Sequence, residues 1–139
     1  MKIQGIFITG TDTGVGKTYV GAGIAAAFRE QGIDVGVMKP AETGCLLRKG
    51  VLVPRDALKL IKAGGVDDPL DIVNPCRFGA PLAPAIAASR EGKRISIKSI
   101  VSAFRTLARK HDRMIVEGAG GIMVPLTTSY NYLDLAKIL

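Results

Sequence analysis

Short apolar runs alternate with helix-length stretches from the start of the chain, and this alternation predicts strands and helices in turn. Residues 3–9 form an apolar run that predicts a buried strand, and residues 18–31 predict a helix that ends before Gly32. Residues 34–39 predict a second strand, which Pro40 ends. A strand, a helix and a strand at this spacing form a βαβ unit, so we expect an α/β fold with a parallel sheet and helices on both faces.

The pattern after the second strand is more interrupted. Residues 41–54 contain two glycines and end in a proline, which predicts a loop. The other expected elements are a short helix at 56–62, an extended stretch at 72–78, a turn at 79–84, a small helix that begins at 85 and stops near Gly92, an amphipathic helix at 96–111, a strand at 114–116 and a helix at 132–139. These strands are few for a doubly wound sheet, so we expect the sheet to be incomplete at its C-terminal end.

Composition indicates a folded protein outside the membrane. Of the 139 residues, 47% are hydrophobic, which disfavours disorder, and charged residues interrupt every apolar run before it reaches membrane-spanning length. The N-terminus lacks the apolar stretch of a signal peptide, so we expect a cytoplasmic protein with no membrane partner. Cys45 and Cys76 are expected to be free thiols, and His111 is expected to be a solvated residue at the end of a helix.

A net charge of +7 raises the alternative of a nucleic-acid-binding protein. Much of this charge lies in basic residues between positions 90 and 113. Aromatic residues make up only 5% of the chain and do not alternate with the basic residues as a stacking platform requires. The spacing of Arg105, Arg109 and Arg113 is typical of the solvated face of a helix, so we expect no nucleic-acid partner.

A glycine-rich loop, Gly-Thr-Asp-Thr-Gly-Val-Gly-Lys-Thr at 10–18, connects the first predicted strand to the first predicted helix. The backbone N–H groups of such a loop and of the helix N-terminus bind phosphate without side chains. We expect Lys17 to contact the β- and γ-phosphates of a nucleotide and Thr18 to bind Mg²⁺. The first glycine lies at 10 rather than 11, one residue earlier than in the strict motif, so a plain tight turn is the alternative.

Three charged residues lie where a parallel sheet collects its ligands, at the ends of predicted strands or the start of a helix. Glu117 ends an apolar strand before a glycine run, which favours a metal or nucleotide contact over a solvated strand end. Asp56 begins a helix and could equally be its N-cap, and Lys39 could equally be a solvated lysine. Their shared position beside the phosphate loop favours a common site.

Several motifs in the sequence resemble those of the dethiobiotin synthetase family, in the same order and over essentially the whole chain. They are Gly-Thr-Asp-Thr-Gly-Val-Gly-Lys-Thr at 10–18, Lys39-Pro40 with Thr43-Gly44, Asp56, Asn74-Pro75, Pro81 with Pro84, and Val-Glu-Gly-Ala-Gly-Gly at 116–121. The Thr-Asp-Thr form of the loop accounts for the shifted first glycine. The resemblance implies a P-loop α/β fold, in which residues 1–139 would be a single domain, the N-terminal majority of the family's domain.

The resemblance also implies an enzyme, an ATP-dependent cyclo-ligase of biotin biosynthesis that requires Mg²⁺ and acts as a homodimer. Its reaction carboxylates 7,8-diaminononanoate with CO₂, phosphorylates the carbamate to a carbamic-phosphoric anhydride, and closes the ring to give dethiobiotin, ADP and phosphate. The implied site residues are Lys39 and Lys17 for catalysis; Gly14, Val15, Gly16, Lys17, Thr18, Tyr19, Asp56, Glu117, Gly118, Ala119 and Gly120 for ATP; Thr13, Lys39 and Thr43 for the substrate; and Thr18, Asp56 and Glu117 for Mg²⁺.

The sequence departs from the family in two respects. Gly14 stands where some members carry an acid, and the family continues past residue 139 with further strands, part of the adenine pocket and dimer contacts. Two other functions are alternatives: a related P-loop amidoligase of cobalamin synthesis, and a non-catalytic partition-type ATP switch. The switch class usually carries a lysine early in its loop, where this chain has Thr11-Asp12-Thr13, so the sequence favours the synthetase.

Overall fold

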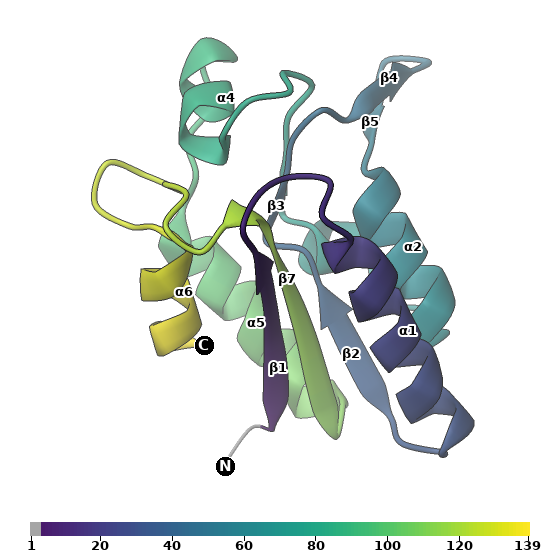
Figure 1. The fold of residues 1–139 in the computed structure, drawn as a ribbon. Coiled ribbons are helices and arrows are strands. Elements are labelled where there is room, and N and C mark those ends of the chain that lie inside the picture. The colour runs from purple at the N-terminus through teal and green to yellow at the C-terminus, as the bar shows by residue number, and fades with distance from the viewer. Residues whose placement is uncertain (1–3) are drawn as a thin grey trace.

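A three-stranded parallel sheet lies at the centre of the computed structural model, which describes residues 4–139 (Figure 1). Its strands are β1 (Gly5–Gly10), β7 (Arg113–Gly121) and β2 (Val35–Met38), in the spatial order β1-β7-β2. β7 pairs in parallel with both neighbours, so the predicted parallel sheet is confirmed. Of the strand predicted at 3–9, residue 3 lies outside the described residues.

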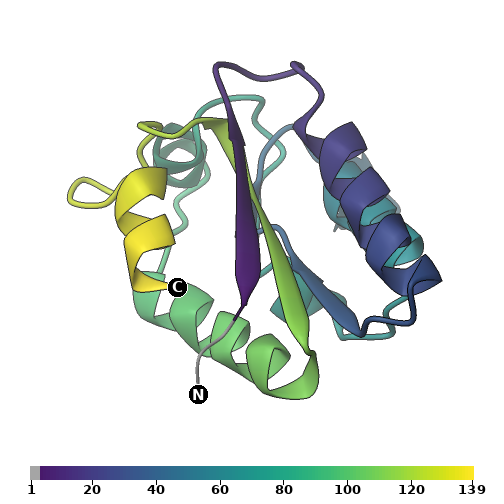
Figure 2. The ribbon, with the colours of Figure 1, turned by 60° about the horizontal axis from the view of Figure 1, so that its bottom comes forward.

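Helices cover both faces of the sheet (Figure 2). One side holds α1 (Lys17–Glu30) and α2 (Arg55–Gly64), and the other side holds α5 (Ile97–Lys110) and α6 (Tyr132–Ile138). Strand residues such as Val37, Ile115 and Val116 are buried between these layers. Because β7 is covered on both faces, its residues 114–116 are continuously apolar rather than alternating.

Polar caps begin the two helices on the α5 side. Ser96 precedes α5, and its hydroxyl accepts a hydrogen bond from the N–H of Ser99 at 3.1 Å. Asn131 and Asp134 form a capping box at α6, with reciprocal hydrogen bonds of 2.9 and 3.0 Å. Buried residues then recur along α5 at the spacing that predicted this helix, and they are Ile100, Phe104, Leu107 and Ala108.

The prediction of a featureless loop after β2 is wrong. Ala41–Glu42 forms a short strand, β3, and the antiparallel strands β4 (Leu46–Arg48) and β5 (Val51–Val53) form a hairpin. Lys49 and Gly50 connect the hairpin with φ angles of 49° and 77°. Two successive positive φ angles are what a two-residue type I′ turn requires, so the glycine there marks a hairpin turn rather than an open loop.

The extended stretch predicted at 72–78 is only partly correct. Leu70–Val73 forms one helical turn, α3, and Cys76–Arg77 forms β6, which pairs in parallel with β3. The carbonyl of Pro69 accepts two N–H groups of the α3 turn, and this local hydrogen bonding overrides the strand preference of its β-branched residues. The small helix expected from 85 is α4 (Pro84–Arg90).

His111 is not the solvated residue that the sequence suggested. Its side chain is 5% exposed, and its two ring nitrogens lie 2.8 Å from Asp34 Oδ1 and 2.7 Å from Asp68 Oδ2. Asp68 is itself buried and also accepts a hydrogen bond from Lys110 Nζ at 2.7 Å. The cluster ties the start of β2 and the end of α5 to the segment after α2.

We expect Asp68→Asn to lower the free energy of unfolding by about 1.5 kcal/mol, because it removes a buried charged acceptor from both Lys110 and His111. Denaturant-induced unfolding of the variant and its parent measures the difference. Asp71→Asn is the matched control, because the side chain of Asp71 is 82% exposed and its ion pair is solvated. Equal losses in the two variants would contradict the role given to the buried cluster.

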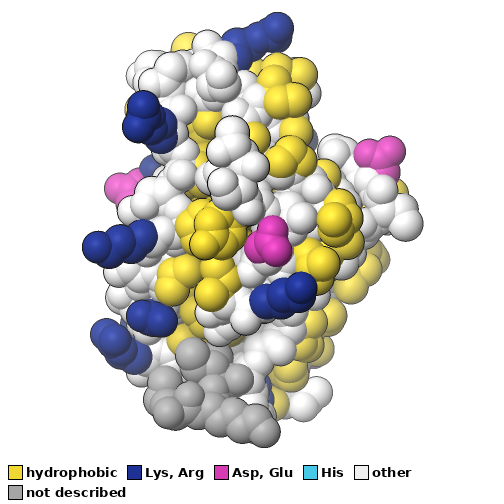
Figure 3. All heavy atoms as spheres, turned by 90° about the vertical axis from the view of Figure 1, so that its left-hand side faces the viewer, with side chains coloured by type: hydrophobic (Ala, Val, Ile, Leu, Met, Phe, Trp, Pro, Cys, Tyr) yellow, Lys and Arg dark blue, Asp and Glu magenta, His cyan; other side chains and the backbone are white. Residues whose placement is uncertain are grey.

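The outer edge of β1 has no neighbouring strand among residues 4–139. Ile6 on this strand is 41% exposed, and Figure 3 shows apolar side chains gathered on this side of the molecule. An unpaired edge of this kind is a surface on which a further strand can pair.

Within residues 4–139, every helix is too short or too polar to span a membrane.

Candidate active site

The glycine-rich loop connects the C-terminal end of β1 to α1. Gly14 and Gly16 have φ angles of 76° and 106°, a region that glycine adopts without strain. Gly16 is the N-cap of α1, so the N–H groups that begin this helix lie beside the loop. A Cβ on Gly10 would lie 2.7 Å from Val15 Cγ2, so a larger residue at position 10 would require the Val15 side chain to move.

Lys17 is held inside this loop. It is 8% exposed, and its Nζ donates a hydrogen bond to the carbonyl oxygen of Asp12 at 2.6 Å. Burial lowers the pKa of the Lys17 ammonium, and the nearby charge of Lys39 lowers this pKa further. The ammonium therefore lies with little water around it, in the cavity that Gly14 and Gly16 also line.

Glu117 is the centre of the site. It is 1% exposed, and its Oε1 accepts hydrogen bonds from Thr18 Oγ1 at 2.7 Å and from Lys39 Nζ at 2.8 Å. Its Oε2 is also buried and has no hydrogen-bond partner among the described residues. Buried carboxylate oxygens are normally paired, so the protein alone leaves part of the Glu117 carboxylate unsatisfied.

Lys39 follows β2 and is 3% exposed, so the alternative of a solvated lysine is wrong. Its Nζ also donates to the carbonyl oxygen of Gly118 at 2.9 Å and lies 3.8 Å from Asp56 Oδ2. Its backbone is held on both sides: its N–H donates to Val73 O at 2.9 Å, and Asn74 Nδ2 donates to its carbonyl at 2.6 Å. Both the position and the direction of this side chain are therefore fixed.

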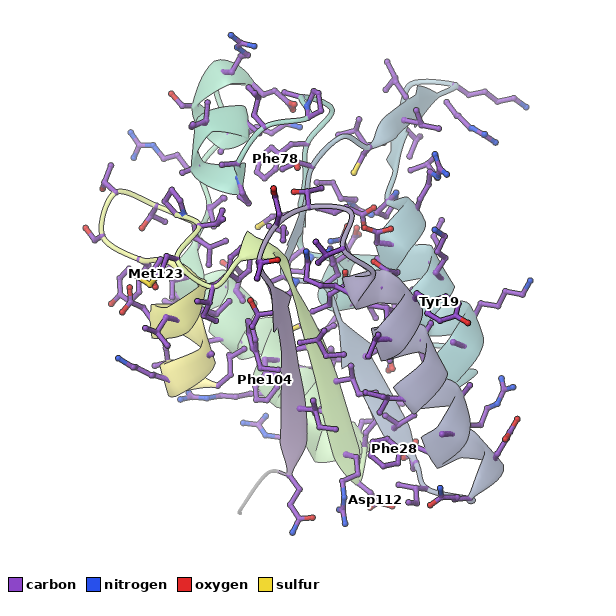
Figure 4. The ribbon with its side chains drawn as sticks, viewed as in Figure 1. Tyr19, Phe28, Phe78, Phe104, Asp112 and Met123 are labelled. Atoms are coloured by element: carbon purple, nitrogen blue, oxygen red, sulfur yellow. The ribbon has the colours of Figure 1, made fainter. Side chains whose placement is uncertain are left out.

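An open cavity of ≈ 370 Å³ lies over these groups, at the C-terminal ends of the strands. The predicted site residues that line it are Thr13, Gly14, Gly16, Lys17, Thr18, Tyr19, Lys39, Thr43, Asp56, Glu117, Ala119 and Gly120. Val15 and Gly118 do not line it; the side chain of Val15 is 53% exposed. Tyr19 lies at the rim, since it is 86% exposed and Figure 4 shows it on the outer side of α1.

A second cavity, of ≈ 580 Å³, adjoins the first and shares Thr13, Thr43, Ala119 and Gly120 with it. Most of its other lining residues are apolar, and they are Pro81, Leu82, Ala83, Pro84, Met123, Val124 and Pro125. The charged cavity around Glu117 therefore continues into a less polar space.

A comparison with protein families agrees with this geometry. The family model described as AAA domain matches residues 4–139. The chain belongs to this AAA domain family. Proteins of the family are P-loop NTPases, so the fold class predicted from the glycine-rich loop is confirmed.

Several relatives match nearly all of this chain, and they are named ATP-dependent dethiobiotin synthetase BioD. The protein of Anaeromyxobacter dehalogenans (strain 2CP-C) is 46% identical over 137 residues, which are 99% of this chain and 60% of the relative. Those of Thermodesulfovibrio yellowstonii and Methanocaldococcus jannaschii are 47% and 42% identical, over 88% and 96% of this chain and 51% and 61% of their own lengths. The resemblance seen in the motifs is confirmed, and the chain spans 51–61% of the length of these relatives.

Two residues that line the cavity, Glu42 and Lys59, were not predicted from the sequence. Glu42 on β3 is 5% exposed, and burial raises its pKa. Its carboxylate accepts the N–H groups of Asp56 and Ala57 at 2.9 and 3.0 Å. No local pattern pointed to Glu42, because Asp56 was itself a candidate N-cap and the acceptor for the start of α2 comes from another segment. Lys59 lies one helical turn after Asp56, on the same face of α2.

The oxygen atoms around Glu117 fit a Mg²⁺ ion that binds together with a nucleotide. The Thr18 hydroxyl and the carboxylates of Asp56 and Glu117 are hard oxygen donors on residues that line one cavity. Asp56 is not the N-cap of α2, because Pro54 holds that position. No group of three or more His, Cys, Asp or Glu side chains in residues 4–139 could hold a metal alone. This is compatible with Mg²⁺, which usually takes one or two carboxylates and completes its shell with water and phosphate.

Proposed function

We propose that this chain carries the ATP- and Mg²⁺-binding part of a dethiobiotin synthase, a cyclo-ligase that converts 7,8-diaminononanoate, CO₂ and ATP to dethiobiotin, ADP and phosphate. The names of relatives that are 41–47% identical support this reaction class. The observation that carries the proposal is the buried ammonium of Lys39, 2.8 Å from Glu117 Oε1 and beside the phosphate loop. A protein that only binds and releases ATP has no need of a cation at this place.

The proposed reaction has three bond-forming steps. One amine nitrogen of the substrate attacks CO₂ and loses a proton, which gives a carbamate. A carbamate oxygen attacks the γ-phosphorus of ATP, the bond from that phosphorus to the bridging oxygen breaks, and ADP leaves. The second amine attacks the carbon of the resulting anhydride and loses a proton, the carbon–oxygen bond to phosphate breaks, and the cyclic urea and inorganic phosphate form.

Two lysines stabilise the negative charge in this reaction. Lys17 and the N–H groups of the loop bind the phosphates of ATP. Lys39 has three N–H donors, and Glu117 and the Gly118 carbonyl accept two of them, so one is left for the carbamate and the transferring phosphoryl group. Thr18, Asp56 and Glu117 hold Mg²⁺, which supplies positive charge to the phosphates when it is bound.

In this proposal the substrate extends from the first cavity into the second. Thr13 and Thr43 line both, so their hydroxyls are placed to bind the diamine end beside Lys39. The less polar second cavity has room for the aliphatic chain. Val15, Tyr19 and the segment 118–120 contribute to ATP binding through their backbone N–H groups. As the resemblance implies, the whole protein is proposed to be a cytoplasmic homodimer.

A turnover assay tests the proposed function. The protein as its gene encodes it is incubated with diaminononanoate, bicarbonate and ATP, and dethiobiotin is measured by mass spectrometry. We expect dethiobiotin and ADP in equal amounts, and neither when the diamine is omitted. ATP hydrolysis that ignores the diamine would favour the ATP switch, and ATP-dependent amidation of a carboxylate would favour the amidoligase; both results would contradict the proposal.

We expect Glu117→Gln to raise the Mg²⁺ concentration that gives half-maximal turnover by about tenfold, because an amide is a weaker Mg²⁺ ligand than a carboxylate. ATP binding measured without metal should change by less than about twofold, since Lys17 and the loop are unaltered. Glu30→Gln is the matched control, an exposed acid at the last position of α1. An unchanged Mg²⁺ titration in Glu117→Gln would remove Glu117 from the metal site.

A further inference from the structure

The helix that carries Asp56 begins without a cap of its own. Pro54 is the N-cap of α2, with φ −84° and ψ 96°, and no local side chain accepts a hydrogen bond from the first turn. The first N–H groups of a helix have no partner within the helix, and a proline side chain cannot supply one. The start of α2 therefore depends on an acceptor from another segment.

Glu42 supplies both missing acceptors. Its Oε1 accepts the N–H of Asp56 at 2.9 Å, and its Oε2 accepts the N–H of Ala57 at 3.0 Å. These N–H groups lie at the second and third helical positions, which are the ones that a local Ser or Asp cap usually satisfies. Glu42 is 5% exposed, so its charge is stabilised by these two donors and by the helix dipole rather than by water.

The segment that joins Glu42 to α2 is held near its start, where the N–H groups of Gly44 and Cys45 donate to Ala80 O and Phe78 O, but its far end is weakly packed. It forms the β4–β5 hairpin, which projects beyond α2 in Figure 1. Leu47 and Val51 on this hairpin are 69% and 63% exposed, so it buries little apolar surface. Glu42 thus ties the two ends of the segment together at its base, next to the cavity.

We propose that Glu42 is a positioning residue: by holding the backbone N–H of Asp56, it sets where the Asp56 carboxylate lies in the cavity. Glu42 is given this role rather than that of a ligand, because each of its oxygens accepts a backbone N–H at the start of α2. The Asp56 carboxylate needs such support, because its side chain is 38% exposed. Its one ion-pair partner within the described residues is Lys39, whose Nζ lies 3.8 Å from Asp56 Oδ2. The inference rests on the proposed function, in which Asp56 binds Mg²⁺.

The test removes the cap and then restores it from another position. Glu42→Ala deletes both acceptors, and Pro54→Ser gives α2 a local hydroxyl cap. The two single variants and the double variant are made in the protein as its gene encodes it. Mn²⁺ binding to the ATP complex is measured by electron paramagnetic resonance, ATP binding is measured without metal, and the melting temperature is recorded for each variant.

We expect Glu42→Ala to weaken Mn²⁺ binding by about tenfold, as the loss of a supporting hydrogen bond to a metal ligand commonly does. Metal-free ATP binding should stay within about twofold of the parent, because the phosphate loop is unchanged. The double variant should return Mn²⁺ binding to within about threefold of the parent, because the new cap holds the same helix start. Pro54→Ser alone should bind Mn²⁺ as the parent does. If Glu42→Ala does not fold, the Mn²⁺ affinity of the double variant tests the proposal by itself.

Glu91→Ala is the matched control, since Glu91 Oε1 likewise accepts a backbone N–H, that of Ala80 at 2.9 Å, but at a place away from the cavity. It should lower the melting temperature without changing Mn²⁺ binding. If Glu42→Ala behaves in the same way, Glu42 is only a structural residue and the inference is overturned. A double variant that folds but still binds Mn²⁺ about tenfold more weakly also overturns it. If the parent binds no Mn²⁺ with ATP, the proposed function fails first, and this inference fails with it.

Discussion

Replacing Lys39 with glutamine should lower turnover by about a hundredfold or more, a loss on the order of 3 kcal/mol of transition-state stabilisation. Glutamine keeps a side chain of similar shape but removes the charge. The carbamate and the γ-phosphate are both anionic and must come within bonding distance, so a buried ammonium beside them stabilises the charge that develops. ATP binding should change much less than turnover, because Lys39 contacts Glu117 and the Gly118 carbonyl rather than the phosphate loop.

Lys62→Gln is the matched control for this substitution. Lys62 lies on α2 as an exposed residue outside the cavity, so the same loss of charge there should leave turnover within about twofold of the parent. The measurement is the initial rate of dethiobiotin formation at saturating ATP. A near-normal rate in Lys39→Gln would show that Lys39 is not the cation of the reaction.

Replacing Lys17 with alanine should weaken ATP binding by about 30- to 100-fold, or about 2 to 3 kcal/mol. Lys17 is 8% exposed, and within residues 4–139 its ammonium donates one hydrogen bond, to the carbonyl of Asp12, which it can exchange for a phosphate. The circular dichroism spectrum should not change, because Lys17 begins α1 and packs into the loop rather than into the apolar core.

Isothermal titration with ATP measures the affinity, and Lys98→Ala is the control. Lys98 is an exposed lysine in the first turn of α5, away from the phosphate loop. Its replacement should leave the affinity unchanged. An affinity in Lys17→Ala within about twofold of the parent, a difference of about 0.4 kcal/mol, would contradict the assignment of the loop as a phosphate site.

The long regular elements could be predicted because one buried face recurs at a fixed spacing. The helix predicted at 96–111 is found at Ile97–Lys110, and the helix predicted at 18–31 is found at Lys17–Glu30. The β4–β5 hairpin could not be predicted in this way, since it depends on two positive φ angles at Lys49 and Gly50. In such short segments the conformation of one or two residues decides the structure, and hydrophobic spacing carries little information.

In the site, too, some residues could be predicted from the local sequence pattern, whereas the partners of others depend on tertiary contacts. Glu117, Lys39 and the loop could be placed together because parallel strands bring their C-terminal ends to one edge of the sheet. The partners of Glu42 and His111 could not be foreseen. Glu42 caps a helix 14 residues later, and His111 pairs with Asp34 across 77 residues of sequence. Contacts of this kind are set by how elements pack, and no residue spacing within one element encodes them.

The transfer of ¹⁸O from labelled bicarbonate to inorganic phosphate is the most direct test of the central claim, that a carbamate oxygen attacks the γ-phosphorus of ATP beside Lys39. The protein as its gene encodes it is mixed with diaminononanoate, ATP and ¹⁸O-bicarbonate in unlabelled water, and the phosphate released in the first turnovers is analysed by mass spectrometry. We expect one labelled oxygen in each phosphate and an equal amount of dethiobiotin. Phosphate without the ¹⁸O label, as expected if water attacks ATP, or no dethiobiotin at all, would contradict the account.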